Sequence, residues 1–324
     1  MTGRPWQRRL LRWLRIAYLA VLAAAVPFLV VARREEVADL LGDLAGARHV
    51  LMAASFAIGF VLIPLSAYFW LVSLRMLGRR PLFLDLTVTA ARSLPARYVP
   101  LMVTFAISRV ALMQRRGIPG PPLALTAALE MAVSLAVSVA YGLLLLGWAG
   151  GLPGGLAIPI VAAVGVIVAA SPSVAGRTVA VVARRRGLDS LAPVSGFTWP
   201  GYLHMIMASA CYWTLAAAVF CLYMRSFEAA DGFGTARLAG AFVLTWGGLR
   251  FLSVIAPHGI GVVEVTLPSL LGAADPLALG ILIFGFRVVL LLRDLLGAAV
   301  SEFLAARRMP VEGRPVKRSE GTEP

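Results

Sequence analysis

Long apolar blocks, separated by short polar segments, are the dominant pattern in this chain of 324 residues. A helix of roughly 20 apolar residues crosses the hydrocarbon core of a bilayer, which is about 30 Å thick. The blocks are continuous and lack the alternation of a barrel strand, so they predict membrane-spanning α-helices. Six of them are predicted to be full spans: Leu14–Val31, Val50–Leu74, Leu123–Trp148, Leu156–Ala170, Tyr202–Met224 and Leu277–Leu304.

Two further apolar blocks are interrupted by helix-breaking residues. The first covers Leu82–Met113 and contains Pro95–Pro100, and the second covers Arg237–Leu271 and contains Ala256–Gly261. Proline removes a backbone donor and glycine lowers helix propensity. Each block is therefore predicted to split into two half-helices.

The arginines between the blocks indicate how the chain crosses the membrane, because cytoplasmic loops carry an excess of Lys and Arg. If the N-terminus is cytoplasmic, the arginines after the second span are cytoplasmic too. Those after the first broken block are also cytoplasmic only if that block turns back within the membrane. The second broken block then enters and leaves at the outer face. The arginines concerned are Arg75, Arg79 and Arg80 after the span, and Arg115 and Arg116 after the broken block.

The predicted fold is an all-α polytopic membrane protein with about six full spans and two re-entrant helical hairpins. Re-entrant segments from opposite faces are typical of inverted repeats. A shift of 157 positions superimposes Pro100 on Pro257 and Glu130 on Arg287, which is consistent with such a repeat. The expected organisation is a basic cytoplasmic N-terminus over residues 1–13, a membrane domain over 14–308 and a disordered cytoplasmic tail over 309–324.

Composition and charge support a membrane protein and indicate its partners. Hydrophobic residues make up 60% of the chain, and 30 Lys and Arg against 16 Asp and Glu give a formal net charge of +14. The cations lie mainly in short loops and at the ends, where they orient a membrane protein. Anionic lipid headgroups, rather than nucleic acid, are therefore the expected partners, and no residue spacing predicts a metal or another cofactor.

Glu130 is the clearest candidate for a functional residue within the membrane. A charged side chain at the centre of a bilayer costs at least about 2.5 to 3.5 kcal/mol unless it faces protein or water. Thr126, Ser134 and Ser138 lie on the same helix face as Glu130. This polar stripe fits either a helix–helix contact held by hydroxyl groups or the wall of a hydrated cavity.

The last predicted span carries Arg287 and Asp294 on one face, two turns apart, with Arg293 adjacent and off that face. These charges fit a structural ion pair with another helix. Alternatively, Arg287 binds phosphate, because the guanidinium fork matches phosphate geometry. A pair between Glu130 and Arg287 is compatible with both interpretations.

The broken blocks add Arg97, Tyr98 and Arg109 in the first, and His258 and Glu264 in the second. The two arginines either line a headgroup path or extend to the inner surface of the membrane. Glu264 either supports the N-terminus of a half-helix electrostatically or takes a proton or a cationic headgroup. His258 titrates near neutrality, so it either couples to protons or has a structural role in a turn.

Three stretches of the sequence resemble the transmembrane region of the lysylphosphatidylglycerol synthase family. They are Ser66–Trp70, the segment that begins Arg97-Tyr98-Val99-Pro100, and Pro257–Glu264. Within the third, His258 replaces a glycine of the family pattern and Val263 replaces an arginine. The resemblance covers nearly the whole chain and implies a flippase-like module, but not lipid synthesis, because the sequence contains no aminoacyl-transfer domain.

The leading hypothesis is therefore movement of a phospholipid or lipid-linked headgroup between the leaflets of a bacterial plasma membrane. The expected substrates are anionic or aminoacylated phospholipids or polyprenyl-linked lipids. One alternative is a non-transporting partner of a lipid-modifying enzyme or glycosyltransferase. The chain is also a candidate for association with copies of itself as a homo-oligomer. A membrane-embedded enzyme acting on lipid phosphate is disfavoured, because the chain offers neither a nucleophile beside a base nor a carboxylate cluster for a metal.

Overall fold

A computed structural model of the protein describes residues 42, 46–98, 103–150, 165, 176, 181, 198–248 and 261–308. Within these residues the fold is all-helical and contains no strand, as the sequence predicts. Several expected features lie outside the described residues: the span Leu14–Val31, the span Leu156–Ala170 apart from Gly165, the tail over 309–324 and His258.

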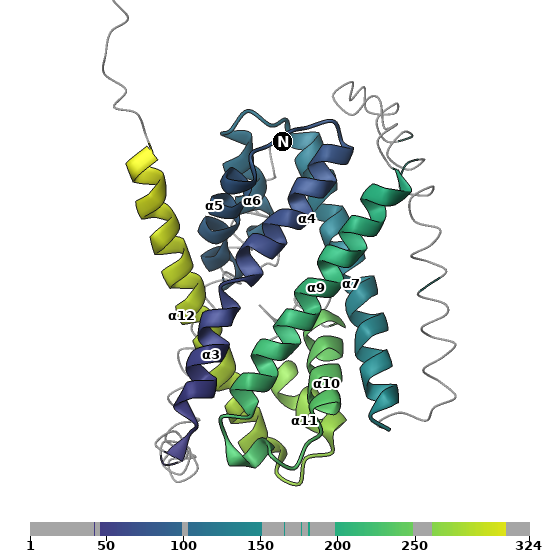
Figure 1. The fold of residues 1–324 in the computed structure, drawn as a ribbon, viewed down its shortest axis with the longest axis vertical. Helices are drawn as coiled ribbons and strands as arrows, with labels where there is room; N and C mark the ends of the chain where they lie inside the picture. Colours follow the sequence, from purple (N-terminus) through teal and green to yellow (C-terminus); the bar gives the residue numbers. More distant parts are fainter. Residues whose placement is uncertain are drawn as a thin grey trace, which may run out of the picture.

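Three helices of the described part are long and apolar enough to cross a membrane. They cover His49–Met76, Gly120–Trp148 and Trp199–Met224, with lengths of 28, 29 and 26 residues. The rise of 1.5 Å per residue makes each roughly 40 Å long, which exceeds the hydrocarbon core. The predicted helices at these positions are confirmed, with bounds that differ by a few residues. In Figure 1 the second is α7 and the third is α9.

The first of these helices bends between α3 (His49–Gly59) and α4 (Leu62–Met76). Pro64 has no N–H to donate to the carbonyl of Phe60, and the N–H of Ile63 bonds to that carbonyl instead, at 3.1 Å. The Gly59 carbonyl therefore loses its usual helical partner. Nη1 of Arg293, on α12, donates to it at 3.2 Å. The bend thus creates the acceptor that holds one of the buried arginines.

Both interrupted blocks form two shorter helices, as predicted. The first contains α5 (Phe83–Ser93), a 3₁₀ turn (Leu94–Tyr98) and α6 (Val103–Gln114), and the second contains α10 (Thr235–Gly248) and α11 (Val263–Leu271). Helices of 9 to 14 residues are roughly 13 to 21 Å long, too short to cross a bilayer alone. Within each block the two helices pack against each other. We call these pairs the first hairpin and the second hairpin.

Each hairpin begins and ends on the same side of the molecule. Nη1 of Arg116, after α6, lies 2.7 Å from Oδ1 of Asp85 in the first turn of α5. At the second hairpin, a Cβ on Gly272 would lie 3.4 Å from Nη2 of Arg237, near the start of α10. The first hairpin lies in the upper half of Figure 1 and the second in the lower half. The two hairpins therefore occupy opposite ends of the molecule.

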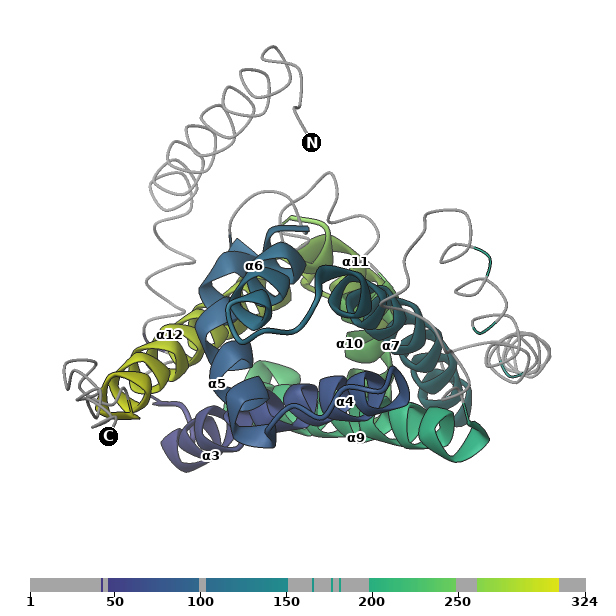
Figure 2. The same ribbon diagram turned by 90° about the horizontal axis from the view of Figure 1, so that it is seen from above.

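The long helices hold the two hairpins together. α10 packs along α7, α4 packs on α9, and α12 (Pro276–Arg308) contacts both α5 and α11. Seen from above, these contacts give a three-sided arrangement, with α4 and α9 along one side and α7 with α10 and α11 along another (Figure 2). Stacked and edge-to-face rings of Phe220, Phe242 and Phe286 join α9, α10 and α12.

Candidate functional site

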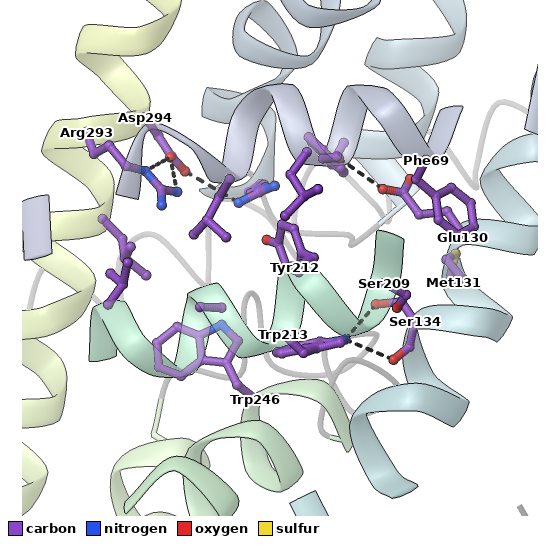
Figure 3. Close-up of a pocket in the computed structure, with 18 of the residues that line it drawn as sticks. Phe69, Glu130, Met131, Ser134, Ser209, Tyr212, Trp213, Trp246, Arg293 and Asp294 are labelled. Atoms are coloured by element: carbon purple, nitrogen blue, oxygen red, sulfur yellow. Dashed lines mark hydrogen bonds and ion pairs between the residues drawn. The ribbon is translucent and has the colours of Figure 1, made fainter. Parts of the chain in front are cut away.

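A cavity of about 150 Å³ lies between the two hairpins and the long helices. A cavity needs only about 10 to 15 Å³ of such volume to hold one water, so this one has room for a small polar group. Its wall combines aromatic side chains with four charged residues, which are Arg97, Glu130, Arg293 and Asp294. Figure 3 shows Arg293 and Asp294 at one side of the cavity and Glu130 at the other.

The Glu130 carboxylate, on α7, is held by three side chains. It accepts hydrogen bonds from Nε1 of Trp70 at 2.7 Å and from the hydroxyl of Ser66 at 3.2 Å. Both donors lie on one face of α4, one turn apart. Nη1 of Arg109, on α6, lies 3.4 Å from the same carboxylate. The structure thus brings together Glu130 and Arg109, two predicted site residues, with two side chains from the stretch Ser66–Trp70.

Arg109 is the most deeply buried cation of this group, with a fully buried side chain. Its guanidinium lies 4.3 Å from the centre of the Trp70 ring, and Nη2 donates to the Ser66 carbonyl at 3.2 Å. A buried charge is tolerated when it is paired and hydrogen-bonded. Arg109 therefore does not extend to the surface, and it connects the first hairpin to α4 and α7.

The polar stripe on α7 serves both purposes considered for it. Thr126 accepts a hydrogen bond from Ser73 of α4 at 3.1 Å, and Ser138 is buried where α7 meets α10. These two residues form helix–helix contacts. Glu130 and Ser134, which lie between them, line the cavity. The stripe is therefore a packing surface at its ends and a cavity wall in its middle.

Asp294, on α12, is the centre of the second charged group. Its carboxylate is fully buried and accepts hydrogen bonds from Nε of Arg293 at 2.9 Å and from the Tyr98 hydroxyl at 3.1 Å. Sequence reasoning missed Arg293, because its Cα lies off the face that Arg287 and Asp294 share. Its long side chain folds back onto the neighbouring carboxylate and also reaches the Gly59 carbonyl.

Arg97 lines the cavity but is held only loosely. Its Nη1 lies 3.7 Å from Oδ2 of Asp294, beyond hydrogen-bonding distance, and its guanidinium lies 4.6 Å from the centre of the Phe105 ring. Within the described part of the chain it makes no hydrogen bond. Its side chain is 18% exposed, against 1% for that of Asp294. This guanidinium is therefore the one best placed to contact a molecule in the cavity.

Glu264 and Arg287 form an ion pair beside the cavity rather than in its wall. Glu264 lies in the first turn of α11, and its Oε2 accepts a hydrogen bond from the N–H of Gly261 at 2.8 Å. Arg287 lies over the Trp246 ring, 4.5 Å from its centre. The structure thus gives Arg287 the partner Glu264, and gives Glu130 the partner Arg109. The role of Glu264 as support for a helix N-terminus agrees with this geometry.

The cavity also contains residues that sequence reasoning missed. Ser209, Tyr212 and Trp213 line it from α9. Nε1 of Trp213 donates to the backbone and side-chain oxygens of Ser134, at 3.0 and 3.1 Å. The Ser209 hydroxyl is buried and has no hydrogen-bond partner among the residues that the structure describes. The spacing of these three residues along α9 places them on one helix face, which is the signal that the sequence does contain.

Comparison with models of known protein families and with curated protein sequences finds no match. The family resemblance noted in the sequence therefore stays a hypothesis. The function has to be inferred from the membrane-length helices, the two hairpins and the charged cavity between them.

Proposed function

We propose that this protein is a lipid flippase or flippase-like transporter of a bacterial plasma membrane. It moves a phospholipid or lipid-linked headgroup between the leaflets while the acyl chains stay in lipid. The observation that carries the proposal is a cavity with four charged side chains in its wall, located between two short helical hairpins from opposite ends of the molecule. The resemblance to the lysylphosphatidylglycerol synthase transmembrane region agrees with it.

The membrane arrangement in this proposal follows from helix length and charge. In this proposal the three long apolar helices and α12 cross the bilayer, and the sequence predicts two further spans at Leu14–Val31 and Leu156–Ala170. The hairpins are re-entrant, because their helices are too short to cross and each returns to the side from which it starts. The end that carries Arg75, Arg80 and Arg115 is cytoplasmic by the positive-inside rule.

An inverted repeat accounts for the similarity of the two halves. The shift of 157 positions takes Gln114, the end of α6, onto Leu271, the end of α11. In each half one ion pair links the second helix of the hairpin to the long helix that follows. The pair is Arg109 with Glu130 in one half and Glu264 with Arg287 in the other, so the signs are reversed.

The proposed mechanism lowers the barrier to headgroup movement by replacing the water around the headgroup. A polar or charged group pays several kcal/mol to enter hydrocarbon without partners. The cavity offers guanidinium, carboxylate and hydroxyl groups at this depth, with an aromatic wall between them. Movement of the two hairpins relative to the long helices then opens the cavity to one leaflet and afterwards to the other.

A transport assay with purified protein in vesicles tests this proposal. Fluorescent phosphatidylglycerol and phosphatidylethanolamine are placed in both leaflets, and the loss of signal on adding a membrane-impermeant quencher reports movement. We expect the protein to accelerate movement at least tenfold over empty vesicles, and Glu130→Gln to abolish most of the gain. Glu228→Gln, an exposed carboxylate of the loop after α9, is the matched control and should behave as wild type.

Absence of acceleration for every lipid tested would contradict the proposal. If the protein instead co-purifies with a lipid-modifying enzyme whose activity is unaffected by Glu130→Gln, the non-transporting partner becomes the better hypothesis.

A further inference from the structure

The described charges at the cavity do not cancel. Its wall and the groups paired with the wall include three guanidinium groups, of Arg97, Arg109 and Arg293, against two carboxylates, of Glu130 and Asp294. Three positive and two negative charges leave one positive charge. A buried charge without a counter-ion is unfavourable, so this excess indicates an anionic partner.

The excess charge is located on Arg97. Arg109 lies against Glu130 and bonds to Ser66, and Arg293 bonds to Asp294. The neighbouring pair of Glu264 and Arg287 is balanced and adds no charge. Among the described residues only Arg97 lines the cavity as a cation without a hydrogen bond.

The donors that face the cavity define the shape of the missing partner. A guanidinium offers five N–H donors in a planar fork that matches two oxygens of a carboxylate or phosphate. Ser209 also lines the cavity, and its buried hydroxyl has no hydrogen-bond partner in the described part of the chain, whereas buried hydroxyls are normally bonded. The partner therefore carries one negative charge and has oxygens that accept hydrogen bonds from both the guanidinium fork and a hydroxyl.

A phosphodiester has these properties. It carries one negative charge, delocalised over two non-bridging oxygens, and two further ester oxygens. A phosphomonoester carries up to two charges near neutral pH and would leave the site negative. Within a bilayer, the abundant phosphodiesters are those of phospholipid headgroups.

We infer that the cavity binds the phosphodiester of a phospholipid, with the Arg97 guanidinium on its non-bridging oxygens and the Ser209 hydroxyl as a further donor. This assignment rests on the proposed function, and it names the chemical class of the headgroup that the cavity accepts. Arg293 and Tyr98 are positioning residues, because they orient Asp294, which in turn lies beside Arg97.

Lipid binding to the purified full chain tests the inference by native mass spectrometry in detergent. Phosphatidylglycerol is compared with a glucosyl diacylglycerol of the same acyl chains, which has no phosphate. We expect Arg97→Gln to weaken phosphatidylglycerol binding at least tenfold, Ser209→Ala to weaken it several-fold, and neither change to alter binding of the glucosyl lipid. Arg92→Gln removes the same charge from α5, where Arg92 pairs with Glu302 outside the cavity, and should bind as wild type.

Several outcomes would overturn the inference. Equal affinity of wild type and Arg97→Gln for phosphatidylglycerol, in samples with the same melting temperature, rules out Arg97 as the ligand. If palmitate binds as tightly as phosphatidylglycerol, and Arg97→Gln weakens the binding of both, the cavity is a carboxylate site instead. Competition by soluble glycerophosphoglycerol as strong as that by the lipid assigns the phosphodiester to a free metabolite rather than to a headgroup.

The inference and the proposed function can fail separately. Lipid binding that depends on Arg97, without any acceleration of lipid movement in vesicles, retains the phosphodiester site and removes transport. Accelerated movement of the glucosyl lipid, with phosphatidylglycerol movement insensitive to Arg97→Gln, retains transport and removes the phosphodiester site.

Discussion

Charged residues within the apolar helices of this protein are stabilised by neutral donors as well as by opposite charges. Glu130 illustrates this, because its shortest contact is with the indole N–H of Trp70 and its ionic partner is more distant. The carboxylate, the guanidinium of Arg109 and the hydroxyl of Ser66 form one network. Removal of one member leaves the others without partners, so the effects of substitutions in this group should not be additive.

We expect Arg109→Gln to lower the free energy of unfolding by about 3 to 5 kcal/mol, because it removes the fully buried guanidinium from its network and leaves the partly buried Glu130 carboxylate without its counter-ion. The double variant with Glu130→Gln should recover part of this loss, since the unpaired charge is also removed. Reversible unfolding in detergent by a denaturant series measures both.

Arg116→Gln is the matched control. It breaks the exposed pair with Asp85, which is worth at most about 1 kcal/mol. Losses of similar size in Arg109→Gln and Arg116→Gln would contradict a structural role for the pair of Arg109 and Glu130.

Site residues whose side chains are costly to desolvate could be predicted from the sequence, whereas site residues with a low desolvation cost could not. Glu130, Arg97 and Asp294 stand out in apolar segments because a charge in hydrocarbon requires a reason. Ser209 does not, since hydroxyl residues are common in membrane helices. Arg293 was missed because a helical-face argument follows the direction of Cβ, and the arginine side chain is long enough to leave that face.

Among the helices, close contacts depend on small residues. α7 and α10 approach each other at Gly240, where a Cβ would lie 2.9 Å from the backbone nitrogen of Leu146 and 3.0 Å from the carbonyl oxygen of Gly142. Small residues allow such approach in membrane proteins, where packing rather than hydrophobicity holds helices together. This contact sets how closely α10, the first helix of the second hairpin, lies against α7.

Gly240→Ala should destabilise the protein by about 1 to 3 kcal/mol, because the backbones of α7 and α10 must separate to admit the methyl group. Gly248→Ala, at the end of the same helix, is the control, since a Cβ there meets no atom of the described residues within 4 Å. It should be neutral or stabilise slightly through helix propensity. Melting temperatures in detergent compare the two, and an equal or higher value for Gly240→Ala would refute the close contact.

The sequence predicts the helices better than their bends and contacts. Uninterrupted apolar blocks give α7 and α9 directly, and clustered proline and glycine give the two breaks. The bend before α4 was not predicted, because a single Pro64 lies within an apolar block and changes neither its length nor its composition. Which helices then pair depends on contacts such as that at Gly240, and no periodicity within one helix specifies its partner.

At the scale of the whole molecule, the two halves share one design with opposite charges. Each hairpin is linked to the following long helix by one ion pair, and each arginine of these pairs lies over a tryptophan ring. If the halves are related by an axis in the membrane plane, the first hairpin enters from the cytoplasm and the second from outside. The proposed transport mechanism depends on this arrangement, because it gives the cavity a route to each leaflet.

Accessibility of single cysteines tests the arrangement directly. The background variant replaces Cys211 and Cys221 by serine, and cysteines are then placed at the exposed residues Arg80, Arg115 and Glu228. Positions 80 and 115, which flank the first hairpin, should react with an impermeant maleimide only from the cytoplasmic side, and position 228 only from outside. Each is measured in intact cells and in inverted vesicles. Reaction of 80 and 115 from different sides would mean that the chain between them crosses the bilayer, and a cavity between opposed re-entrant hairpins would then be impossible.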